Sequence, residues 1–413
     1  MAVSDNLTDF LTDVANAIRQ KKGTQALIDP QDFSDEIASI SGGGESVDWT
    51  TMDALLDELQ IAVGTYPVTY SITNTLSHCT TNNNTSSVIT GSSYSATITA
   101  NNNYTLTGAT VSITMGGNDI TSSAYNNGAI SIASVTGNVV ISVSTVSTLV
   151  AYATAQSGVT YTAVTDLSSY DDDKINQISK AISNCQDITS STQTVYFSDE
   201  TSISVGATRS YTLSTQEPMT DRIIGFNHDE LWNYQEYGTL TATNKAGITW
   251  MMVDCLATKY EINDTSSNAG GWDACELRTV TLPTIEATMP QTLQNIIVPV
   301  IKDTADGGGT NYTGIVSSTD DLFLLAEIEI NNSGNNSQAG SNEGVVYKYW
   351  ALNTSASDRI KYYDDAGTST ATAWWTRSSY ISVVGKWTRV NTSGGFSGSS
   401  GTVLNGVSFA YCT

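Results

Sequence analysis

The stretch NNNYTLTGATVSITMGGNDITSSAYNNGAISIASVTGNVVISVS, residues 101–144, consists of short runs of alternating apolar and polar residues separated by Asn and Gly. Two similar runs, VTYSI at 68–72 and YSATITA at 94–100, precede it. A period of two residues places one side of each run on a core and the other side in water. Thr, Ile, Val and Tyr favour strands, whereas Asn and Gly favour turns. These patterns predict a small β-sandwich over residues 64–147.

The composition of the whole chain of 413 residues extends this picture. Charged residues make up 14%, and 41 acidic against 17 basic residues give a net charge of −24. This acidic balance argues against nucleic acid and anionic lipid as partners, because both require clustered Lys and Arg. No segment has the roughly 20 consecutive apolar residues of a membrane span, so no membrane insertion is expected. A hydrophobic fraction of 39% with 20 Tyr argues against disorder.

The first 63 residues are predicted to be helical. Apolar residues at helical spacing (Leu7, Phe10, Leu11, Val14, Ala15 and Ile18) form one stripe, with Asp5 or Asn6 as a cap and Gly23 as a stop. Further helices are expected in 29–40 and 49–63, on either side of the Gly-rich segment 41–46. Short helices bury little surface alone, so region 1–63 is interpreted as an attachment or oligomerisation region, the alternative being a hairpin that packs on itself. The first ten residues lack the plan of a secretory signal, so synthesis in the bacterial cytoplasm without export by the usual signal route is expected.

Residues 148–200 are interpreted as a connecting segment with one amphipathic helix in DDDKINQISKAISNC. Its acidic triplet, Asp171 to Asp173, suggests either a calcium loop or the start of a helix. The order of residues required by an EF-hand is missing, so the start of a helix, where the dipole favours carboxylates, is preferred.

The five cysteines and two histidines carry no recognisable metal or catalytic pattern. No two cysteines have CxxC spacing, which favours reduced thiols and no bound cofactor or metal, although a Cys255–Cys275 pair stays open. His228 lies beside Asp229 and Glu230, and no GxSxG motif marks a partner serine. His228 is therefore interpreted as a structural hydrogen-bonding residue.

Residues 201–413 differ from the repetitive part of the chain. They carry most of the tryptophans and several distinct motifs, among them GITWMMVDCLATKYEIND (247–264), DLFLLAEIEI (321–330), WWTRSSY (374–380) and GVSFAYC (406–412). The run at 321–330 is predicted to be a buried strand, and GVSFAY a final alternating strand. Trp250, Trp272, Trp374 and Trp375 are assigned to the core.

Two resemblances follow from these motifs. Residues 101–144 resemble the immunoglobulin-like repeats of bacterial and phage tail proteins. The motifs between about 220 and 413 resemble a domain of unknown function from gut-bacterial and phage tail proteins that is related to the C-type-lectin-like fold. The implied fold class is mainly β with N-terminal helices, an immunoglobulin-like β-sandwich and an α+β C-type-lectin-like domain over 201–413.

The second resemblance implies a receptor-binding protein of a phage or prophage tail, located in the virion. Its expected partners are a host cell-surface protein or glycan and other tail proteins, and a homotrimer is expected. The segment SSYISVVGKWTRVNTSGGFSGSSG, followed by GVSFAYC, resembles a region diversified by a retroelement. Substitutions concentrated in residues 355–405 are the expected signature.

A binding surface of this kind combines aromatic anchors with small polar residues. The candidate ligand-binding residues are Tyr362, Tyr363, Ser379, Tyr380, Ile381, Lys386, Trp387, Arg389, Thr392 and Phe396. For Trp387 a place in the core is the alternative. Binding without catalysis is the preferred function. A polysaccharide-degrading enzyme, which needs two suitably spaced carboxylates, and a bacterial surface adhesin are the alternatives.

Overall fold

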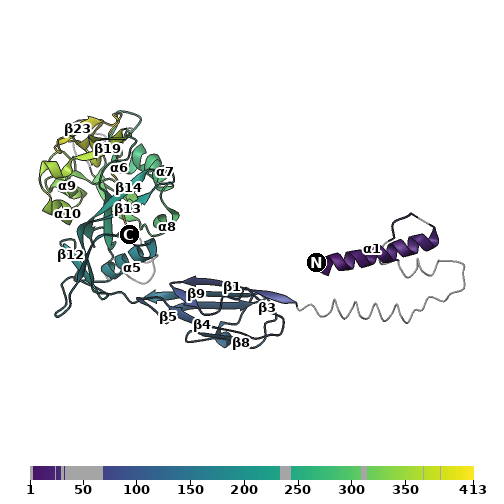
Figure 1. Ribbon diagram of the computed structural model, residues 1–413. Coiled ribbons are helices and arrows are strands. Elements are labelled where there is room, and N and C mark those ends of the chain that lie inside the picture. Colours follow the sequence, from purple (N-terminus) through teal and green to yellow (C-terminus); the bar gives the residue numbers. More distant parts are fainter. Residues whose placement is uncertain are drawn as a thin grey trace.

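A computed structural model describes residues 3–23, 25–28, 32, 68–232, 243–307, 314–365, 367–381 and 383–413 (Figure 1). The fold is mainly β. Helix α1 spans Val3–Lys22 and is followed by Gly23 with φ +68°, which confirms the expected stop. It begins two residues before the expected cap at Asp5. The helices expected in 29–40 and 49–63 and the segment 41–46 lie outside the described residues, apart from residue 32.

Residues 68–147 form two sheets around one core, which confirms the alternating pattern read from the sequence. On strand β4, for example, Tyr94, Ala96 and Ile98 are buried while the residues between them are exposed. One sheet has the order β3-β1-β9-β5-β6 and the other β2-β4-β8-β7. We call residues 68–147 the sandwich. Its elements are β1 (Thr69–Ser77), β2 (Cys79–Thr81), β3 (Ser87–Ile89), β4 (Tyr94–Ala100), β5 (Tyr104–Met115), β6 (Asn118–Asp119), α4 (Thr121–Ala124), β7 (Tyr125–Asn126), β8 (Ala129–Ile132) and β9 (Val139–Ser147).

The described residues from 149 to 413 share a second hydrophobic core, and we call this part the head. Its main sheet has the order β10-β12-β13-β14-β15-β24-β18, with β11 paired in parallel to β13. The strands of this sheet are β10 (Ala151–Tyr152), β11 (Thr162–Asp166), β12 (Thr194–Phe197), β13 (Thr201–Thr212), β14 (Pro218–Phe226), β15 (Ile248–Met252), β18 (Leu322–Phe323) and β24 (Ala410–Cys412). Residues 149–200 thus contribute to the core and the main sheet of the head.

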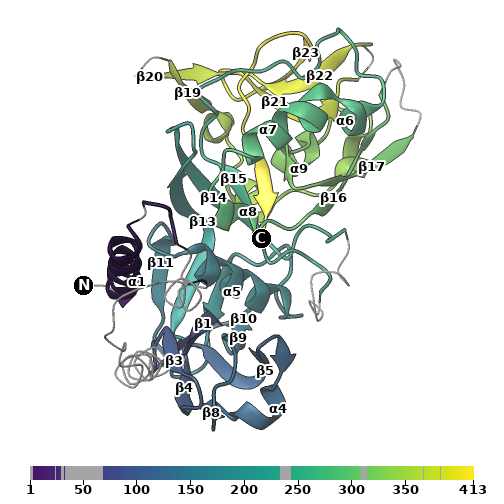
Figure 2. The same cartoon turned by 90° about the vertical axis from the view of Figure 1, so that its right-hand side faces the viewer.

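Smaller sheets and short helices complete the head (Figures 1 and 2). The smaller sheets are the hairpins β16 (Val300–Ala305) with β17 (Ile315–Asp320) and β19 (Lys361–Asp365) with β20 (Thr368–Thr372), and a three-stranded sheet of β21 (Trp374–Ser379), β22 (Lys386–Val390) and β23 (Phe396–Ser400). The helical segments are α5 (Asp172–Ser183), α6 (Gly271–Ala274), η2 (Leu277–Thr281), α7 (Leu282–Glu286), α8 (Gln291–Gln294), α9 (Glu327–Asn331), η3 (Gly340–Glu343), α10 (Lys348–Leu352) and η4 (Ala356–Arg359). None of the described helices is long and apolar enough to span a membrane.

The run at 321–330 is not the single buried strand that we predicted. Only Leu322–Phe323 form strand β18, and Glu327–Asn331 form helix α9. The side chain of Glu329 accepts a hydrogen bond from the backbone N–H of Ala326 at 2.9 Å, which closes the first turn of the helix. A short buried apolar run fits either type of structure, so periodicity alone did not separate them. The final strand is shorter than predicted and comprises Ala410–Cys412.

Several smaller predictions are confirmed. Trp250, Trp272, Trp374 and Trp375 are fully buried. All five cysteines are free. Asp171 caps α5 by accepting the backbone N–H of Lys174 at 2.8 Å, and Asp172 pairs with Arg209.

Candidate functional site: the distal face of the head

Strands β19 to β23 lie at the end of the head that is furthest from the sandwich (Figures 1 and 2). These strands and the turns between them carry all ten residues predicted to bind a ligand, with Tyr380, Ile381 and Thr392 in the turns, and we call the surface that they form the distal face. Its position leaves it accessible when the other end of the molecule is anchored.

Three buried indoles of β21 and β22 tie these strands to neighbouring segments of the head. Each indole donates its N–H to a backbone carbonyl at 2.9 Å: Trp374 to Arg359 at the end of η4, and Trp375 and Trp387 to Tyr260 and Ser267 in the segment between β15 and α6. All three rings are fully buried. A buried Trp with its N–H satisfied is held by packing and by hydrogen bonding at once. Strands β21 and β22, which carry these indoles, are therefore fixed to the rest of the head.

One end of the distal face is the turn between β21 and β22. The backbone N–H of Tyr380 donates to the carbonyl of Lys386 at 3.0 Å and closes this turn. The ring of Tyr380 lies so close to Gly398 that a Cβ there would approach it to 2.7 Å. Ile381 is 41% exposed and Val384 is 54% exposed. This end therefore combines an aromatic ring, two apolar side chains and the half-buried Lys386.

The other end combines aromatic rings with cations. Lys259 Nζ lies 3.6 Å from the centre of the Tyr363 ring, and the Arg359 guanidinium lies 5.5 Å from the centre of the Phe396 ring. A cation over the face of an aromatic ring is attracted to it and helps to hold the ring in place. Tyr362 beside them is 41% exposed.

The two ends are separated along the strand pair β22–β23. Lys386 pairs with Ser400 at one end and Val390 pairs with Phe396 at the other. At about 3.4 Å per residue, four steps place these ends roughly 13 Å apart. The predicted residues therefore form two groups: Tyr380, Ile381 and Lys386 in one, and Tyr362, Tyr363 and Phe396 in the other. Thr392 is exposed in the turn between β22 and β23.

Three of the predicted residues are not available at the surface as expected. Trp387 is fully buried, which agrees with the alternative that it belongs to the core. Its strand neighbour Ser399 is buried as well, and its indole N–H is bonded to the Ser267 carbonyl. Ser379 is 1% exposed. Arg389 is half-buried, and its Nη1 donates to the Asn405 side chain at 2.9 Å.

Sequence reasoning missed three exposed apolar residues on this side of the head: Val384, Val403 and Leu404. Val403 and Leu404 are 40% and 59% exposed. The backbone N–H of Val403 donates to Ser400, the residue paired with Lys386, so Val403 adjoins the first group. Apolar residues flanked by Gly in VVG and GTVLNG are the signal that would have indicated them.

A separate hollow of about 300 Å³ lies on the side of the head beside α7. Glu286, Asp320 and Asp321 are among its lining residues. Burial, and then the Asp321 carboxylate, raise the pKa of Glu286 to about 7. Burial and the neighbouring Asp320 also raise the pKa of Asp321. Near neutral pH this hollow therefore holds one carboxyl group that is partly protonated.

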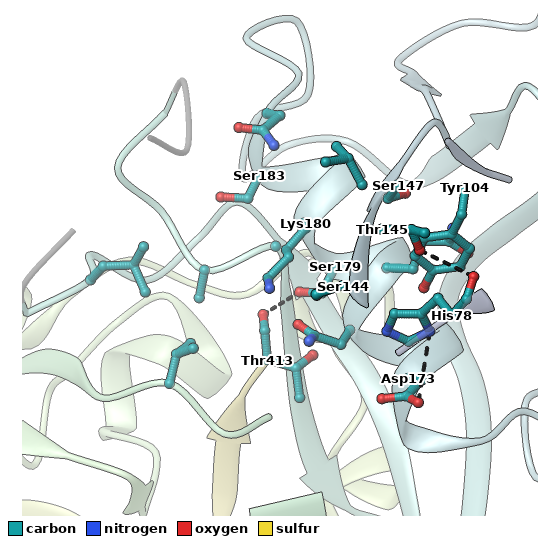
Figure 3. Close-up of a pocket in the computed structure, with 18 of the residues that line it drawn as sticks. His78, Tyr104, Ser144, Thr145, Ser147, Asp173, Ser179, Lys180, Ser183 and Thr413 are labelled. Carbon is teal, nitrogen blue, oxygen red and sulfur yellow. Dashed lines mark hydrogen bonds and ion pairs between the residues drawn. The ribbon is translucent and has the colours of Figure 1, made fainter. Parts of the chain in front are cut away.

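A second hollow, of about 460 Å³, lies at the joint between the sandwich and helix α5 (Figure 3). His78 stacks on Tyr104 with ring centres 4.2 Å apart, and its Nδ1 lies 3.9 Å from Asp173 on α5. Gln177 crosses the joint by donating to the Asn103 carbonyl at 3.0 Å. Burial, then Asp173 and Asp171, raise the pKa of Tyr104 to about 12. Both units supply walls, so the shape of this hollow depends on how they are placed.

His228 is a hydrogen-bonding residue of the interior, as we interpreted it. Its ring stacks on Tyr347, with centres 3.8 Å apart. Nδ1 lies 3.3 Å from Asp229 Oδ1, and Nε2 lies 3.1 Å from the carbonyl of Val345. Among the described residues no group of three or more His, Cys, Asp or Glu is arranged to hold a metal ion.

Residues 246–408 match a family described as a domain of unknown function (DUF6273). The match covers less than half of the chain and brings no activity with it. No curated protein matches the chain. No solved structure matches it.

Proposed function

We propose that this chain is a receptor-binding protein of a phage or prophage tail, and that the distal face contacts a ligand on the host cell. The sandwich, interpreted as immunoglobulin-like, spaces the head from its anchor, and the head is interpreted as C-type-lectin-like. The sequence resemblances support the assignment to a tail. The contact itself is recognition without chemistry.

One observation carries this proposal: exposed aromatic and apolar side chains lie on or near strands that buried, hydrogen-bonded indoles fix to the head. Tyr362 and Ile381 are each 41% exposed, yet they flank strands whose tryptophans are fully buried. Side chains that are ordered before binding lose less conformational entropy when a ligand arrives. Tyr with Ser, Thr and Gly between is also the composition of antibody binding surfaces.

The experiment measures binding of the fluorescently labelled full chain to a panel of intact bacterial strains. Ile381→Ala and Tyr362→Ala should each weaken binding by about 10-fold, the usual effect of removing a contact residue worth more than 1 kcal/mol. Val140→Ala is the matched control, because Val140 is 43% exposed on the sandwich. Equal binding by all variants and the unaltered chain would place the contact elsewhere.

Diversification by a retroelement belongs to the same proposal. Residues 355–405 include β19 to β23 and therefore the distal face. Coding sequences from several isolates should carry substitutions that are concentrated in this range and spare buried residues such as Trp374 and Trp375. Substitutions spread evenly along the chain would contradict the diversification.

The hollow beside α7 favours one alternative, a tail-associated enzyme that degrades polysaccharide. Glycosidases need one carboxyl group that is protonated near neutral pH and a second that is ionised. Glu286, with a pKa of about 7, fits the first role. Release of reducing ends from purified surface polysaccharide, abolished by Glu286→Gln with cell binding intact, would favour the enzyme over the binding protein.

A further inference from the structure

A cluster of four charged side chains is buried where four elements of the head meet. Asp229 follows β14, Lys302 lies on β16, Glu329 on α9 and Arg377 on β21. Their side chains are 1–3% exposed, so water does not reach them. Lys302 contacts Asp229, and Arg377 contacts Glu329 through both guanidinium Nη atoms.

The ammonium group of Lys302 is surrounded by groups that can move its protons. Its Nζ contacts Oδ1 of Asp229 directly and lies 3.4 Å from Oε1 of Glu329. The hydroxyl of Tyr347 lies 2.9 Å from Nζ and 2.8 Å from the same Oδ1. The ring of Phe323 lies 3.9 Å from Nζ and closes the apolar side. The amine nitrogen, the carboxyl group and two proton carriers are therefore within contact of one another.

The two oxygens of Asp229 have different surroundings. The Tyr347 hydroxyl lies within hydrogen-bond distance of both, at 2.8 Å from Oδ1 and 3.0 Å from Oδ2. Oδ1 also faces Lys302 and His228, whereas Oδ2 accepts a hydrogen bond from the Thr249 hydroxyl at 2.5 Å and faces Cys412 Sγ at 3.4 Å. A donor aimed at one oxygen stabilises negative charge that develops there during attack on the carbon. In an attack on Cγ, Oδ2 is thus placed to stay on the carbon as the carbonyl oxygen, and Oδ1 is placed to leave.

We propose that Lys302 and Asp229 condense to an amide bond between their side chains. Nζ attacks Cγ of Asp229, the Nζ–Cγ bond forms and the Cγ–Oδ1 bond breaks. Two protons of the ammonium group leave with Oδ1 as one water molecule, carried by Glu329 and by Tyr347, and one stays on the amide nitrogen. No oxidant or cofactor enters the balance.

Charge is conserved in this step. Burial alone would raise the pKa of Asp229, but the Lys302 ammonium and His228 outweigh it and hold that pKa well below its usual range. Burial lowers the pKa of Lys302, and the carboxylates of Asp229 and Glu329 outweigh it and raise the pKa. The starting state is therefore an ion pair whose net charge is zero. The amide and the water molecule that replace it are both neutral, so the net charge does not change.

Burial favours the product. An ion pair in the interior loses its hydration, and that cost disappears when both charges are removed together. Arg377 and Glu329 still balance each other afterwards, so no charge is left alone. Groups held in contact also react as if at an effective concentration of about 10⁵ M or more. The bond would tie β16 to the end of β14 across residues 229–302.

The test is the mass of the unaltered full chain, measured under denaturing conditions after incubation at 37 °C for several days. The expected mass is lower than the sequence mass by one water molecule. Tryptic digestion should yield a branched peptide that joins Lys302 to Asp229. Lys361 is the internal control, because it is equally buried but donates to the carbonyls of Met252 and Val253, and its peptides should be unmodified.

Two variants distinguish the Lys302–Asp229 amide bond from a loss of water at another position in the chain. Lys302→Met should have its full sequence mass, and Thr249→Val should form the bond at least 10-fold more slowly. An unaltered chain that keeps its full sequence mass and gives separate Lys302 and Asp229 peptides overturns the proposal. A mass deficit that persists in Lys302→Met overturns it as well.

Discussion

At the scale of single residues, the head buries several groups that ordinarily stay in water, and this has measurable consequences. Asp221 on β14 is fully buried and accepts a hydrogen bond from the Tyr411 hydroxyl at 2.9 Å. Burial raises its pKa from 3.8 to about 6, although Tyr411 and the nearby Arg209 partly offset this. The folded protein therefore holds the proton of Asp221 more tightly than the unfolded chain does.

The unfolding free energy should consequently depend on pH through Asp221. Because the pKa is raised in the folded state, stability should increase as the pH falls through 6, and the gain should be complete below 3.8, the ordinary pKa of the group. A shift of about two units corresponds to roughly 3 kcal/mol. Asp221→Asn should raise stability at pH 8 by about 1–3 kcal/mol and remove this part of the pH dependence, measured by urea unfolding between pH 5 and 8.

The exposed Asp187 provides the control for this experiment. Asp187→Asn should leave the pH profile of stability unchanged. If Asp221→Asn is less stable than the unaltered chain at pH 8, the buried carboxylate is stabilised by its partners more than burial costs.

The close packing of the Tyr380 ring on Gly398 leads to a prediction about the distal face. Alanine there would place its Cβ 2.7 Å from the ring of Tyr380, so the ring has to move. We expect Gly398→Ala to cost about 1–3 kcal/mol of stability, as overpacking usually does, and to weaken cell binding. Ser397→Ala on the same strand is the control for both measurements. Unchanged stability and binding would mean that the position of Tyr380 is not fixed by this contact.

At the scale of elements, helix α5 connects the two halves of the molecule. Its buried residues, including Ile175, Ile178 and Ile182, pack in the core of the head. On its other side Gln177 reaches the sandwich. The close packing extends to Gly247, where a Cβ would come within 1.9 Å of the Ser179 carbonyl. The helix therefore belongs to the head and also carries the sandwich.

The cap of α5 should contribute measurably to stability. Asp171→Ala removes the acceptor for the backbone N–H of Lys174 and should lower the unfolding free energy by about 1 kcal/mol. Thermal unfolding of the full chain would check this value. Asp187→Ala, in the loop after the helix, should change it by less than half as much. Equal effects of the two substitutions would argue against a capping role.

The elements also illustrate what the sequence can and cannot predict. Regular alternation in YSATITA and NVVISVST predicted the strands of the sandwich, because successive side chains of a strand point alternately to the core and to solvent. The four tryptophans assigned to the core were placed correctly, whereas Trp387 was not, because a Trp beside Lys and Arg fits a core and a binding surface equally well. The ion cluster escaped notice, since its four members are distant in sequence and meet only through tertiary contacts.

At the scale of the whole molecule, the N-terminal region is expected to assemble the chain, and helix α1 offers a test. Ile18 is 4% exposed on this helix, whereas Asn16 is exposed. If the apolar stripe mediates a homotrimer, Ile18→Asp should reduce the molecular mass in solution to that of a monomer. Asn16→Asp should leave the mass unchanged. The measurement is light scattering coupled to size-exclusion chromatography of the full chain.

A weaker assembly should also bind cells more weakly. Several copies of a weak contact reach an avidity well above that of one copy. Ile18→Asp should therefore reduce cell binding by 100-fold or more even though the distal face is intact. Cell binding that is unaffected by a loss of oligomers would show that one head is sufficient.

The position of β24 in the main sheet sets the order in which the molecule can be built on the ribosome. Ala410–Cys412 lie between β15 and β18, so these two neighbours cannot be joined until residues 410–412 have been synthesised. The sandwich contains only residues before 148 and can fold long before that point. A nascent chain thus carries a finished sandwich beside an unfinished head, whose apolar surface is exposed to aggregation and to chaperones until residues 410–412 have been added.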